Sequence, residues 1–471
     1  MTDSAYKVRI GFLPSMRFPH SHEWCRQMRQ RTLDAAARIP GLELVTPDET
    51  VTPYGVVQND DQAQAAIAFY KEQGVDGLLI GAMDFGDEIS AATVAQALGK
   101  PTMLFSTKEG PARDNGERVS DAFCGTLSIG VALRRRRIPF VFGGNLFPEE
   151  DEFRAEVGSF TSVVSAAKSF LGARIGQIGV RPERFETVAY DEKALLRKFG
   201  QRVIPVELSE VVRAAQAMQD DDPRLPETKQ SILGEATVVN INDRTLTLTA
   251  KFELAIKDLV ARRQLAGLGL QCWPALGPSY GIAACSTMGR LTSQGIMAAC
   301  EVDILGALDM VTQYNMVLRR TVPFFIDWTI QHRTRDNTLL AWHCGNGPTV
   351  LRKPGTDVTL RNRRRPLDAP IPEVDAGAGL WEFTVAEGPV TISRLVEYDG
   401  EFKMLIASGA VVEDPAKERG TSAWVEVANL KNLYGTLVEE GFLHHASMIH
   451  GDLRKPLEQF CKLMGIKVIS A

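Results

Sequence analysis

Three short segments of the chain place an acid or an imidazole among apolar and aromatic residues. They are Cys300–Gly306 (CEVDILG), Phe325–Trp328 (FIDW) and Ala341–Gly345 (AWHCG). Burying such a group without a partner costs free energy. A divalent cation would supply that partner, because carboxylate oxygens and neutral imidazole nitrogens are ligands that Mn²⁺, Mg²⁺ and Zn²⁺ accept. We therefore expect the function of the protein to lie in this region.

The candidate ligands in these segments are Glu301, Asp327 and His343. Each one taken singly also fits a structural role, as an acid in the first turn of a helix, an ion-pair partner or a hydrogen-bonded core histidine. Asp303 is the rival of Glu301. Two positions further along a helix it would point elsewhere, so we interpret it as a residue behind the site or as a helix-capping acid.

A fourth candidate comes from the pair His444-His445 near the end of the chain. Adjacent residues of a strand point to opposite faces, so at most one of the two is expected to bind a metal ion.

The composition of the chain is that of an ordinary globular protein with a small-molecule substrate. Its 471 residues predict two or three domains, and its net charge of -5 gives no reason to expect nucleic acid or a membrane surface as a partner. We find no signal peptide and no apolar run of about 18 residues that could span a bilayer. The seven scattered cysteines favour reduced thiols, and hence a cytoplasmic protein.

The N-terminal part alternates apolar strands with amphipathic helices. The run Val8–Pro14 is a predicted strand, and Ser21 is the predicted N-cap of a helix that follows. Continued alternation indicates a parallel sheet covered on both faces, with ligands at the carboxyl ends of its strands. The loop after the first strand is therefore a candidate substrate loop, with Arg17 and His20 as candidate contacts. It lacks the G-x-G-x-x-G of a dinucleotide site.

A second alternating unit follows and leads to the three segments described above. The apolar strand Ala266–Trp273 ends in Trp273-Pro274, a favoured position for a binding site, and Trp273 is a candidate substrate contact. We predict that residues 285–310 form a turn-rich approach and then a helix, with Glu301 in the first half of that helix. The segment 219–227 is polar, contains proline and is predicted as a loop.

From Thr349 onward the pattern becomes β-rich, with Asp399-Gly400 as a predicted hairpin turn. The fold class we expect is α/β: two Rossmann-like, doubly wound domains followed by a C-terminal antiparallel, β-barrel-like domain. The predicted boundaries are 1–172, 173–322 and 323–471.

Two arginine runs, 134–137 and 363–365, have no assigned role. Charge runs are usually solvated faces or subunit contacts. If either run lines the pocket, an anionic sugar becomes the favoured substrate.

Four motifs resemble the L-fucose isomerase and L-arabinose isomerase superfamily. They are ACEVD at 299–303, FFIDW at 324–328, WHCG at 342–345 and LHH at 443–445. The resemblance implies the three-domain fold above and a homo-oligomer, a trimer or a hexamer. It also implies a Mn²⁺-dependent aldose–ketose isomerase.

Carried over residue by residue, the resemblance makes Glu301 and Asp327 metal-binding acids that also share the proton transfer. His343 resembles the histidine ligand of the arabinose branch. His444 or His445 resembles the C-terminal histidine ligand, and we favour His445, which leaves His444 beside the substrate. Arg17 occupies the position of a substrate-touching arginine in the fucose branch.

Such a set suits the interconversion of an aldose and a ketose through an enediol. A cation polarises the sugar oxygens, and a carboxylate moves the proton between C1 and C2. One alternative is a metal-dependent lyase or transferase that acts on a ketose, possibly a sulfonated or phosphorylated one. Another is a non-catalytic sugar-binding module.

Overall fold

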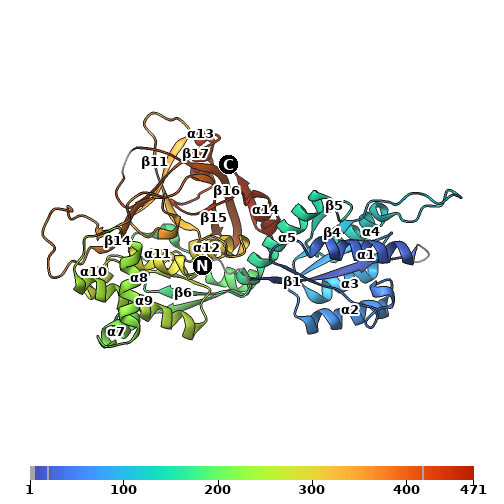
Figure 1. Ribbon diagram of the computed structural model, residues 1–471, viewed down its shortest axis with the longest axis horizontal. Helices are drawn as coiled ribbons and strands as arrows, with labels where there is room; N and C mark the ends of the chain where they lie inside the picture. The colour runs from blue at the N-terminus through green and yellow to red at the C-terminus, as the bar shows by residue number, and fades with distance from the viewer. Residues whose placement is uncertain (1–5, 18–20, 416–417) are drawn as a thin grey trace. The chain divides into compact units, whose positions relative to one another are not determined.

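The computed structural model describes residues 6–17, 21–415 and 418–471 (Figure 1). These residues form two compact units. Unit 1 comprises residues up to Lys168 together with Lys455–Ile466, and unit 2 comprises Ser169–Arg454 together with Lys467–Ala471. None of the helices that the structure describes combines the length and the apolar character needed to span a bilayer.

Unit 1 is built on a parallel sheet, in which the described residues form five strands in the order β2-β1-β3-β4-β5. The strands are β1 (Val8–Ser15), β2 (Leu42–Val45), β3 (Gly77–Ala82), β4 (Thr102–Ser106) and β5 (Val141–Asn145). The helices of this part are α1 (His22–Ala36), α2 (Asp60–Gln73), α3 (Glu88–Leu98), α4 (Ala122–Arg135), α5 (Asp151–Phe170) and α14 (Arg454–Met464). The predicted parallel α/β unit is confirmed in this coarse form.

Helices cover both faces of this sheet. On one face, apolar residues of α2, α3 and α4 pack with those of β1, β3 and β4 in one buried cluster. On the other face, Phe105 of β4 contacts both Phe12 of β1 and Phe153 of α5. The Ser21 side chain accepts a hydrogen bond from the Trp24 N–H and caps α1, as predicted.

Unit 2 contains a second parallel sheet, whose described strands run in the order β10-β9-β6-β7. These strands are β6 (Arg174–Ile178), β7 (Arg202–Val206), β9 (Gly267–Leu270) and β10 (Met297–Cys300). The helices of this unit are α6 (Glu192–Phe199), α7 (Leu208–Ala217), α8 (Arg224–Glu235), α9 (Asp243–Arg263), α10 (Leu276–Tyr280), α11 (Cys285–Ser293), α12 (Ile304–Met316) and α13 (Leu430–Glu439). The predicted loop at 219–227 is too long, because α8 already begins at Arg224.

The rest of unit 2 is a closed antiparallel barrel. Within the described ranges six strands pair in the cyclic order β16-β15-β18-β11-β12-β17, and β17 returns to β16. They are β11 (Phe324–Gln331), β12 (Thr338–His343), β15 (Gly388–Tyr398), β16 (Glu401–Val412), β17 (Thr421–Val427) and β18 (His445–His450). Four further strands extend this sheet: β8 (Val238–Val239), β13 (Thr359–Asn362), β14 (Ala378–Thr384) and β19 (Lys467–Ser470). Closure leaves the ring without unpaired edges.

The predicted hairpin at Asp399-Gly400 is confirmed. Tyr398 pairs with Glu401, and Asp399 and Gly400 have φ angles of 53° and 84°, as a two-residue turn with both central residues in the left-handed region requires.

The prediction that Glu301 lies in the first half of a helix is wrong. Met297–Cys300 forms strand β10, and α12 begins after Asp303, whose side chain accepts a hydrogen bond from the Gly306 N–H. The apolar run before Glu301 is buried and pairs with β9 in the parallel sheet. This pairing makes the run a strand, although its pattern is also compatible with a helix. Glu301 therefore lies in the turn at the carboxyl end of a strand.

Candidate functional site

The turn between β10 and α12 holds Glu301 in an uncommon backbone conformation. Glu301 and Val302 have φ angles of 59° and 62°, and a β-branched residue such as valine rarely adopts this left-handed conformation. A Cβ on Gly269 of β9 would lie 2.8 Å from the Val302 carbonyl carbon, so glycine there lets the turn pack against the strand. Backbone strain of this kind is concentrated at functional sites.

Neighbouring barrel strands place the other predicted residues. Asp327 of β11 pairs with His445 of β18 on one side and with Trp342 of β12 on the other. His343 follows Trp342 and ends β12. Asp327 and His343 of consecutive strands thus lie close to His445, which comes from a distant part of the sequence.

The four side chains lie within a few ångströms of one another. The His445 Nε2 atom is 3.1 Å from a Glu301 carboxylate oxygen and 3.6 Å from Asp327 Oδ1. The His343 Nε2 atom is 4.0 Å from the same Asp327 oxygen. Both histidines are buried, and the two acids are largely buried. Asp327, His343 and His445 form one geometrically possible cation site, and Glu301, His444 and His445 form another.

Two of these atoms have no hydrogen-bond partner among the described residues, Asp327 Oδ1 and His343 Nε2. Leaving buried polar atoms unpaired is costly, so this pair indicates a missing ligand. Neighbouring ligands of an octahedral ion at about 2.1 Å lie about 3 Å apart. The His445–Glu301 and His445–Asp327 distances approach that value, and the oxygen and nitrogen atoms are of the kind that Mn²⁺ accepts. The residues therefore fit a divalent metal ion.

Asp303 lies directly behind His445. One oxygen of its fully buried carboxylate is 2.9 Å from His445 Nδ1, and both oxygens accept hydrogen bonds from Arg394, at 2.6 and 3.0 Å. Since its Nδ1 faces Asp303, the ring of His445 directs Nε2 toward Glu301 and Asp327, and release of the Nε2 proton to a bound cation would leave that nitrogen free as a ligand. Asp303 also caps α12, so the predicted capping role is confirmed.

At this site, charged neighbours oppose the effect of burial on the pKa values of the buried groups. Burial acts to raise the pKa of Asp303, but Arg394 and His445 hold the pKa of that carboxyl well below its usual range. Burial also acts to raise the pKa of Glu301, and the hydrogen bond and charge of His445 lower it instead. For His343 burial favours a lower pKa, but Asp327 and Cys344 raise the pKa to about 10. Asp303 and Glu301 thus stay ionised at neutral pH, and an ionised Glu301 can act as a cation ligand.

Trp273 and a cavity complete the surroundings of Glu301. The Trp273 Nε1–H donates a 2.6 Å hydrogen bond to the second carboxylate oxygen of Glu301. A cavity of about 470 Å³ is lined by Trp273, Glu301, Asp327 and His343, and also by Arg363. Within the described ranges no hydrogen bond or ion pair holds the Arg363 guanidinium. This exposed cation therefore faces the same cavity as the candidate site with its donors unused.

Of the other predicted substrate contacts, His444 lies beside His445, and Arg17 lies in unit 1. His444 packs against His445, with 4.3 Å between the ring centroids, and contacts Phe185. Burial and His445 lower the pKa of His444. Arg17 belongs to unit 1, where its backbone N–H donates to Asp84 and its guanidinium lies over the Phe85 ring. His20 lies outside the described residues.

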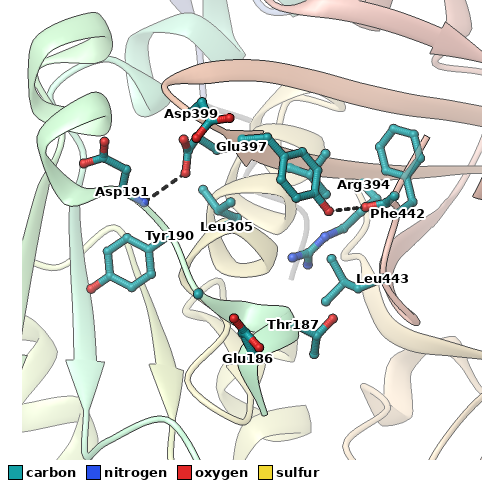
Figure 2. A pocket seen from close by; sticks show the side chains of 14 residues that line it. Glu186, Thr187, Tyr190, Asp191, Leu305, Arg394, Glu397, Asp399, Phe442 and Leu443 are labelled. Carbon is teal, nitrogen blue, oxygen red and sulfur yellow. Dashed lines mark hydrogen bonds between the residues drawn. The ribbon is translucent and has the colours of Figure 1, made fainter. Parts of the chain in front are cut away.

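A second cavity, of about 730 Å³, is shown in Figure 2. It is bordered by Arg394, and the backbone N–H of Asp191 donates to Glu397 at 3.0 Å on its wall. Tyr398 and Gly441 also line this cavity, and the Tyr398 hydroxyl donates to the Gly441 carbonyl oxygen. Since Arg394 also binds Asp303, it lies between this cavity and the groups around His445.

Sequence reasoning missed Arg394 and assigned no role to Arg363. The signal for Arg394 is an arginine inside the apolar strand run VTISRLV, because a fully buried cation requires an anionic partner. For Arg363 the signal was the arginine run itself, and the sequence does not say which of three adjacent arginines faces a cavity.

Comparison with known proteins agrees with the resemblance found in the motifs. Residues 11–171 match the family "Fucose/sulfoquinovose isomerase, N-terminal domain". Residues 341–471 match the family "L-fucose isomerase, C-terminal domain". The second match includes His343, His444 and His445, whereas Glu301 and Asp327 lie between the two matched ranges.

Full-length relatives also match. A sulfoquinovose isomerase of Alkalicoccus urumqiensis is 26% identical over 402 residues, which cover 84% of this chain and 86% of that protein. A sulfoquinovose isomerase of Priestia aryabhattai is 24% identical over 425 residues, which cover 88% of this chain and 90% of that protein. The sulfoquinovose isomerase of Clostridium sp. (strain MSTE9) is 24% identical, over 81% of this chain and 83% of that protein.

Among solved structures, a periplasmic solute-binding protein of Actinobacillus succinogenes 130z with bound D-allose is 14% identical. The match covers 65% of this chain and 92% of that protein, with a TM-score of 0.16, which is too low to support a common fold.

The relatives do not favour the lyase, the transferase or the sugar-binding alternative. The two matched domains and the long relatives show that the chain belongs to the fucose isomerase-like superfamily of aldose–ketose isomerases.

Proposed function

We propose that this aldose–ketose isomerase depends on a divalent metal ion, Mn²⁺, and works through an enediol. The observation that carries the proposal is the convergence of Glu301, Asp327 and His445 from separate elements, with Asp327 Oδ1 left without a hydrogen-bond partner among the described residues. A hard cation in this position polarises the carbonyl and hydroxyl oxygens of the sugar.

Glu301 and Asp327 supply the acid–base chemistry. Moving a proton between C1 and C2 requires a carboxylate within hydrogen-bond reach of both carbons. Glu301 borders the cavity, is ionised, and is held in place by Trp273 on one oxygen and by His445 on the other. Asp327 faces the same cavity from the barrel. We assign the proton transfer to these two residues.

The roles of His343 and His445 differ in this proposal. The Cys344 backbone N–H donates to His343 Nδ1 at 2.9 Å, so a neutral His343 ring carries its proton on Nε2. Such a nitrogen donates to a sugar oxygen more readily than it binds a cation. His445 has the opposite arrangement, because its Nδ1 faces Asp303. We therefore propose Glu301, Asp327 and His445 as ligands, and His343 as a sugar-oxygen donor or a fourth ligand.

Metal analysis of matched variants tests these assignments. Glu301→Gln and His445→Gln are expected to lose bound metal and to lower turnover by about a thousandfold or more. His343→Gln separates the two roles, since a donor variant keeps its metal and a ligand variant does not. Glu426→Gln, at an exposed position on β17, is the control. Normal turnover by Glu301→Gln would refute the assignment.

We also propose an anionic, sulfonated sugar as the substrate. Relatives over most of the chain are named sulfoquinovose isomerase. Arg363 supports the same conclusion from this chain's own residues, because its guanidinium faces the cavity of Glu301 and Asp327 without an acidic partner in the described part of the chain. A sulfonate is a permanent anion that an arginine binds through charge-assisted hydrogen bonds. Arg17, His20, Trp273 and His444 remain the other proposed sugar contacts.

Arg363→Gln and Arg364→Gln form a matched pair for this claim, since both arginines are exposed and Arg364 does not line the cavity. Charge-assisted hydrogen bonds contribute about 1.5–3 kcal/mol. Arg363→Gln should therefore lower the ratio of kcat/KM for sulfoquinovose over kcat/KM for a neutral aldose by about 10–100-fold. Arg364→Gln should leave that ratio unchanged. Equal ratios in both variants would contradict the role of Arg363.

The proposal also covers the oligomeric state and the cellular location of the enzyme. The superfamily suggests a homo-oligomer, a trimer or a hexamer, built from subunits with two Rossmann-like parts. The free cysteines suit a cytoplasmic enzyme. Sedimentation analysis of the purified protein tests the oligomer.

A further inference from the structure

Four cysteines line the cavity that contains Glu301 and Asp327. They are Cys272, Cys285, Cys300 and Cys344. They stand in two pairs, with 3.0 Å between the Sγ atoms of Cys272 and Cys300 and 3.5 Å between those of Cys285 and Cys344. All four are free thiols. The proposed function gives none of them a task.

We propose that Cys272 and Cys300 are an oxidation site, where a peroxide converts the two thiols into a disulfide that reversibly stops isomerisation. The effect on turnover rests on the proposed function, whereas the disulfide itself does not. The paired strands β9 and β10 bring the two residues together. Cys300 pairs with Leu270, and Cys272 follows Leu270 by two residues.

The distance between the sulfur atoms favours this bond. A disulfide requires about 2.05 Å between its sulfur atoms, so the Cys272–Cys300 pair must close by about 1 Å. Cys272 is partly exposed toward the cavity, which gives a small oxidant access, whereas Cys300 is buried. An accessible thiol with a second thiol beside it is the usual arrangement of a redox-sensitive cysteine.

The chemistry balances with hydrogen peroxide as the oxidant. The Cys272 sulfur attacks one peroxide oxygen, the O–O bond breaks, and the products are a sulfenic acid and one water molecule. The Cys300 sulfur then attacks the sulfenic sulfur, the S–O bond breaks, and a second water molecule leaves. Two thiols are oxidised by two electrons and one peroxide is reduced to two waters. A dithiol reductant reverses the bond by thiol–disulfide exchange.

The position of the pair explains why the bond would affect turnover. Cys300 immediately precedes Glu301, and Cys272 immediately precedes Trp273, whose indole N–H donates to Glu301. Glu301 and Val302 are already held in left-handed conformations, so the turn has little freedom to absorb a shift. A misplacement of about 1 Å of a reacting group costs about a hundredfold in rate.

The second pair provides an internal comparison. The sulfur atoms of Cys285 and Cys344 are further apart, and the Cys344 sulfur is also 3.4 Å from His343 Nδ1. Cys285 is buried in helix α11, and neither Cys285 nor Cys344 is adjacent in the sequence to Glu301 or to Trp273. We therefore assign the site to Cys272 and Cys300.

The test treats the purified, Mn²⁺-loaded enzyme with hydrogen peroxide and removes the excess with catalase. Turnover is measured before treatment, after treatment and after addition of dithiothreitol. In parallel, free thiols are alkylated and the peptides are mapped by mass spectrometry. Cys272→Ser, Cys300→Ser and Cys285→Ser undergo the same steps, and each is compared with its own untreated sample.

We expect a Cys272–Cys300 linked peptide, a loss of turnover of at least about tenfold, and recovery with dithiothreitol. Cys272→Ser and Cys300→Ser should show no reversible loss, and Cys285→Ser should respond like the wild type. A linked Cys285–Cys344 peptide, or an equal reversible loss in Cys272→Ser, would overturn the proposal. An enzyme without turnover before treatment would contradict the proposed function instead, and the peptide map would still decide the site.

Discussion

Asp303 contacts three groups whose combined geometry orients the imidazole of His445. Its carboxylate accepts from both terminal nitrogens of Arg394, accepts from the Gly306 N–H in the first turn of α12, and lies against His445 Nδ1. Since Arg394 is 1% exposed, the acid also neutralises a cation that has almost no access to water. Asp303 is therefore a positioning residue for the candidate metal site.

Replacing Asp303 with Asn is predicted to weaken both the fold and metal binding. The variant leaves the Arg394 charge buried without a counter-charge, which should lower the free energy of unfolding by about 3–5 kcal/mol. Loss of the carboxylate behind a histidine ligand should weaken Mn²⁺ affinity by about 10–100-fold. Urea denaturation and a Mn²⁺ titration at a temperature where the variant is folded measure the two effects separately.

A double variant separates positioning from stability. Asp303→Asn with Arg394→Met removes both charges, so much of the lost stability should return. The affinity for Mn²⁺ should stay low, because His445 still lacks its partner. If the affinity returned together with the stability, Asp303 would have a structural role and no positioning role.

Local motifs in the sequence predicted the candidate site residues, but they did not predict the residues that contact and position them. Glu301, Asp327, His343 and His445 were named from local motifs, and the structure places them within short distances of one another. Their roles stay predictions. The contacts of Asp303 with Arg394 join residues 91 positions apart. Such pairing depends on tertiary structure, so no local pattern could reveal it.

At the scale of elements, the β10–α12 turn and the adjacent strand β9 control the position of Glu301. Gly269 of β9 lies against the backbone of Val302 and Asp303, with no room for a side-chain carbon. The sequence predicted a helix through Glu301 because a short apolar run before an acid fits either a helix or a buried strand. The pairing of β10 with β9 decides between them, and it is not visible locally.

Gly269→Ala is predicted to displace the Glu301 turn. The new Cβ would meet the Val302 carbonyl carbon at 2.8 Å, and backbone atoms have no low-cost way to move aside. We expect the free energy of unfolding to fall by about 1–3 kcal/mol and kcat to fall by about a hundredfold. Denaturation and steady-state kinetics measure these quantities.

Gly234→Ala is the matched control for this substitution. Gly234 lies in helix α8, and an added Cβ would meet no atom of the described residues within 4 Å. Alanine favours the helix by up to about 1 kcal/mol, so the control should be slightly more stable and fully active. Equal kinetics in the two variants would show that the turn tolerates the extra carbon.

Helix α12 also carries a buried acid, Asp309, that predicts a pH effect. Its carboxylate accepts from the Ser393 hydroxyl at 2.7 Å. Burial raises the pKa of Asp309 to about 7, although Ser393 and Arg394 act to lower it, and Asp303 adds to the rise. A pKa raised in the folded state means that the fold binds this proton more tightly than the unfolded chain does.

The sign of the effect follows from this difference. The stability from Asp309 is fully present below about pH 4, is lost as the pH rises toward 7, and stays lost above it. The free energy of unfolding of the wild type minus that of Asp309→Asn should therefore fall between pH 4 and pH 8, by as much as about 4 kcal/mol. Urea denaturation at several pH values measures the difference, and a value independent of pH would contradict the shifted pKa.

At the scale of the whole molecule, the periodicity of the sequence was sufficient for the layer types. Apolar strands between amphipathic helices predicted two parallel sheets, and alternating strands with a tight hairpin predicted the antiparallel part. Closure of the barrel depends on the pairing of β16 with β17 and of β11 with β18, which are long-range contacts that strand patterns do not specify. The predicted domain boundaries stay predictions.

The central claim is that a divalent ion held by Glu301, Asp327 and His445 makes this chain an isomerase of a sulfonated sugar. The most direct measurement strips the enzyme with a chelator, verifies the loss by metal analysis, and follows sulfoquinovose by NMR in D₂O while Mn²⁺ is added back. We predict no conversion without metal, and recovery with about one ion per chain together with ketose formation and deuterium at the carbon that receives the proton. Conversion at an unchanged rate by verified metal-free enzyme would contradict the account.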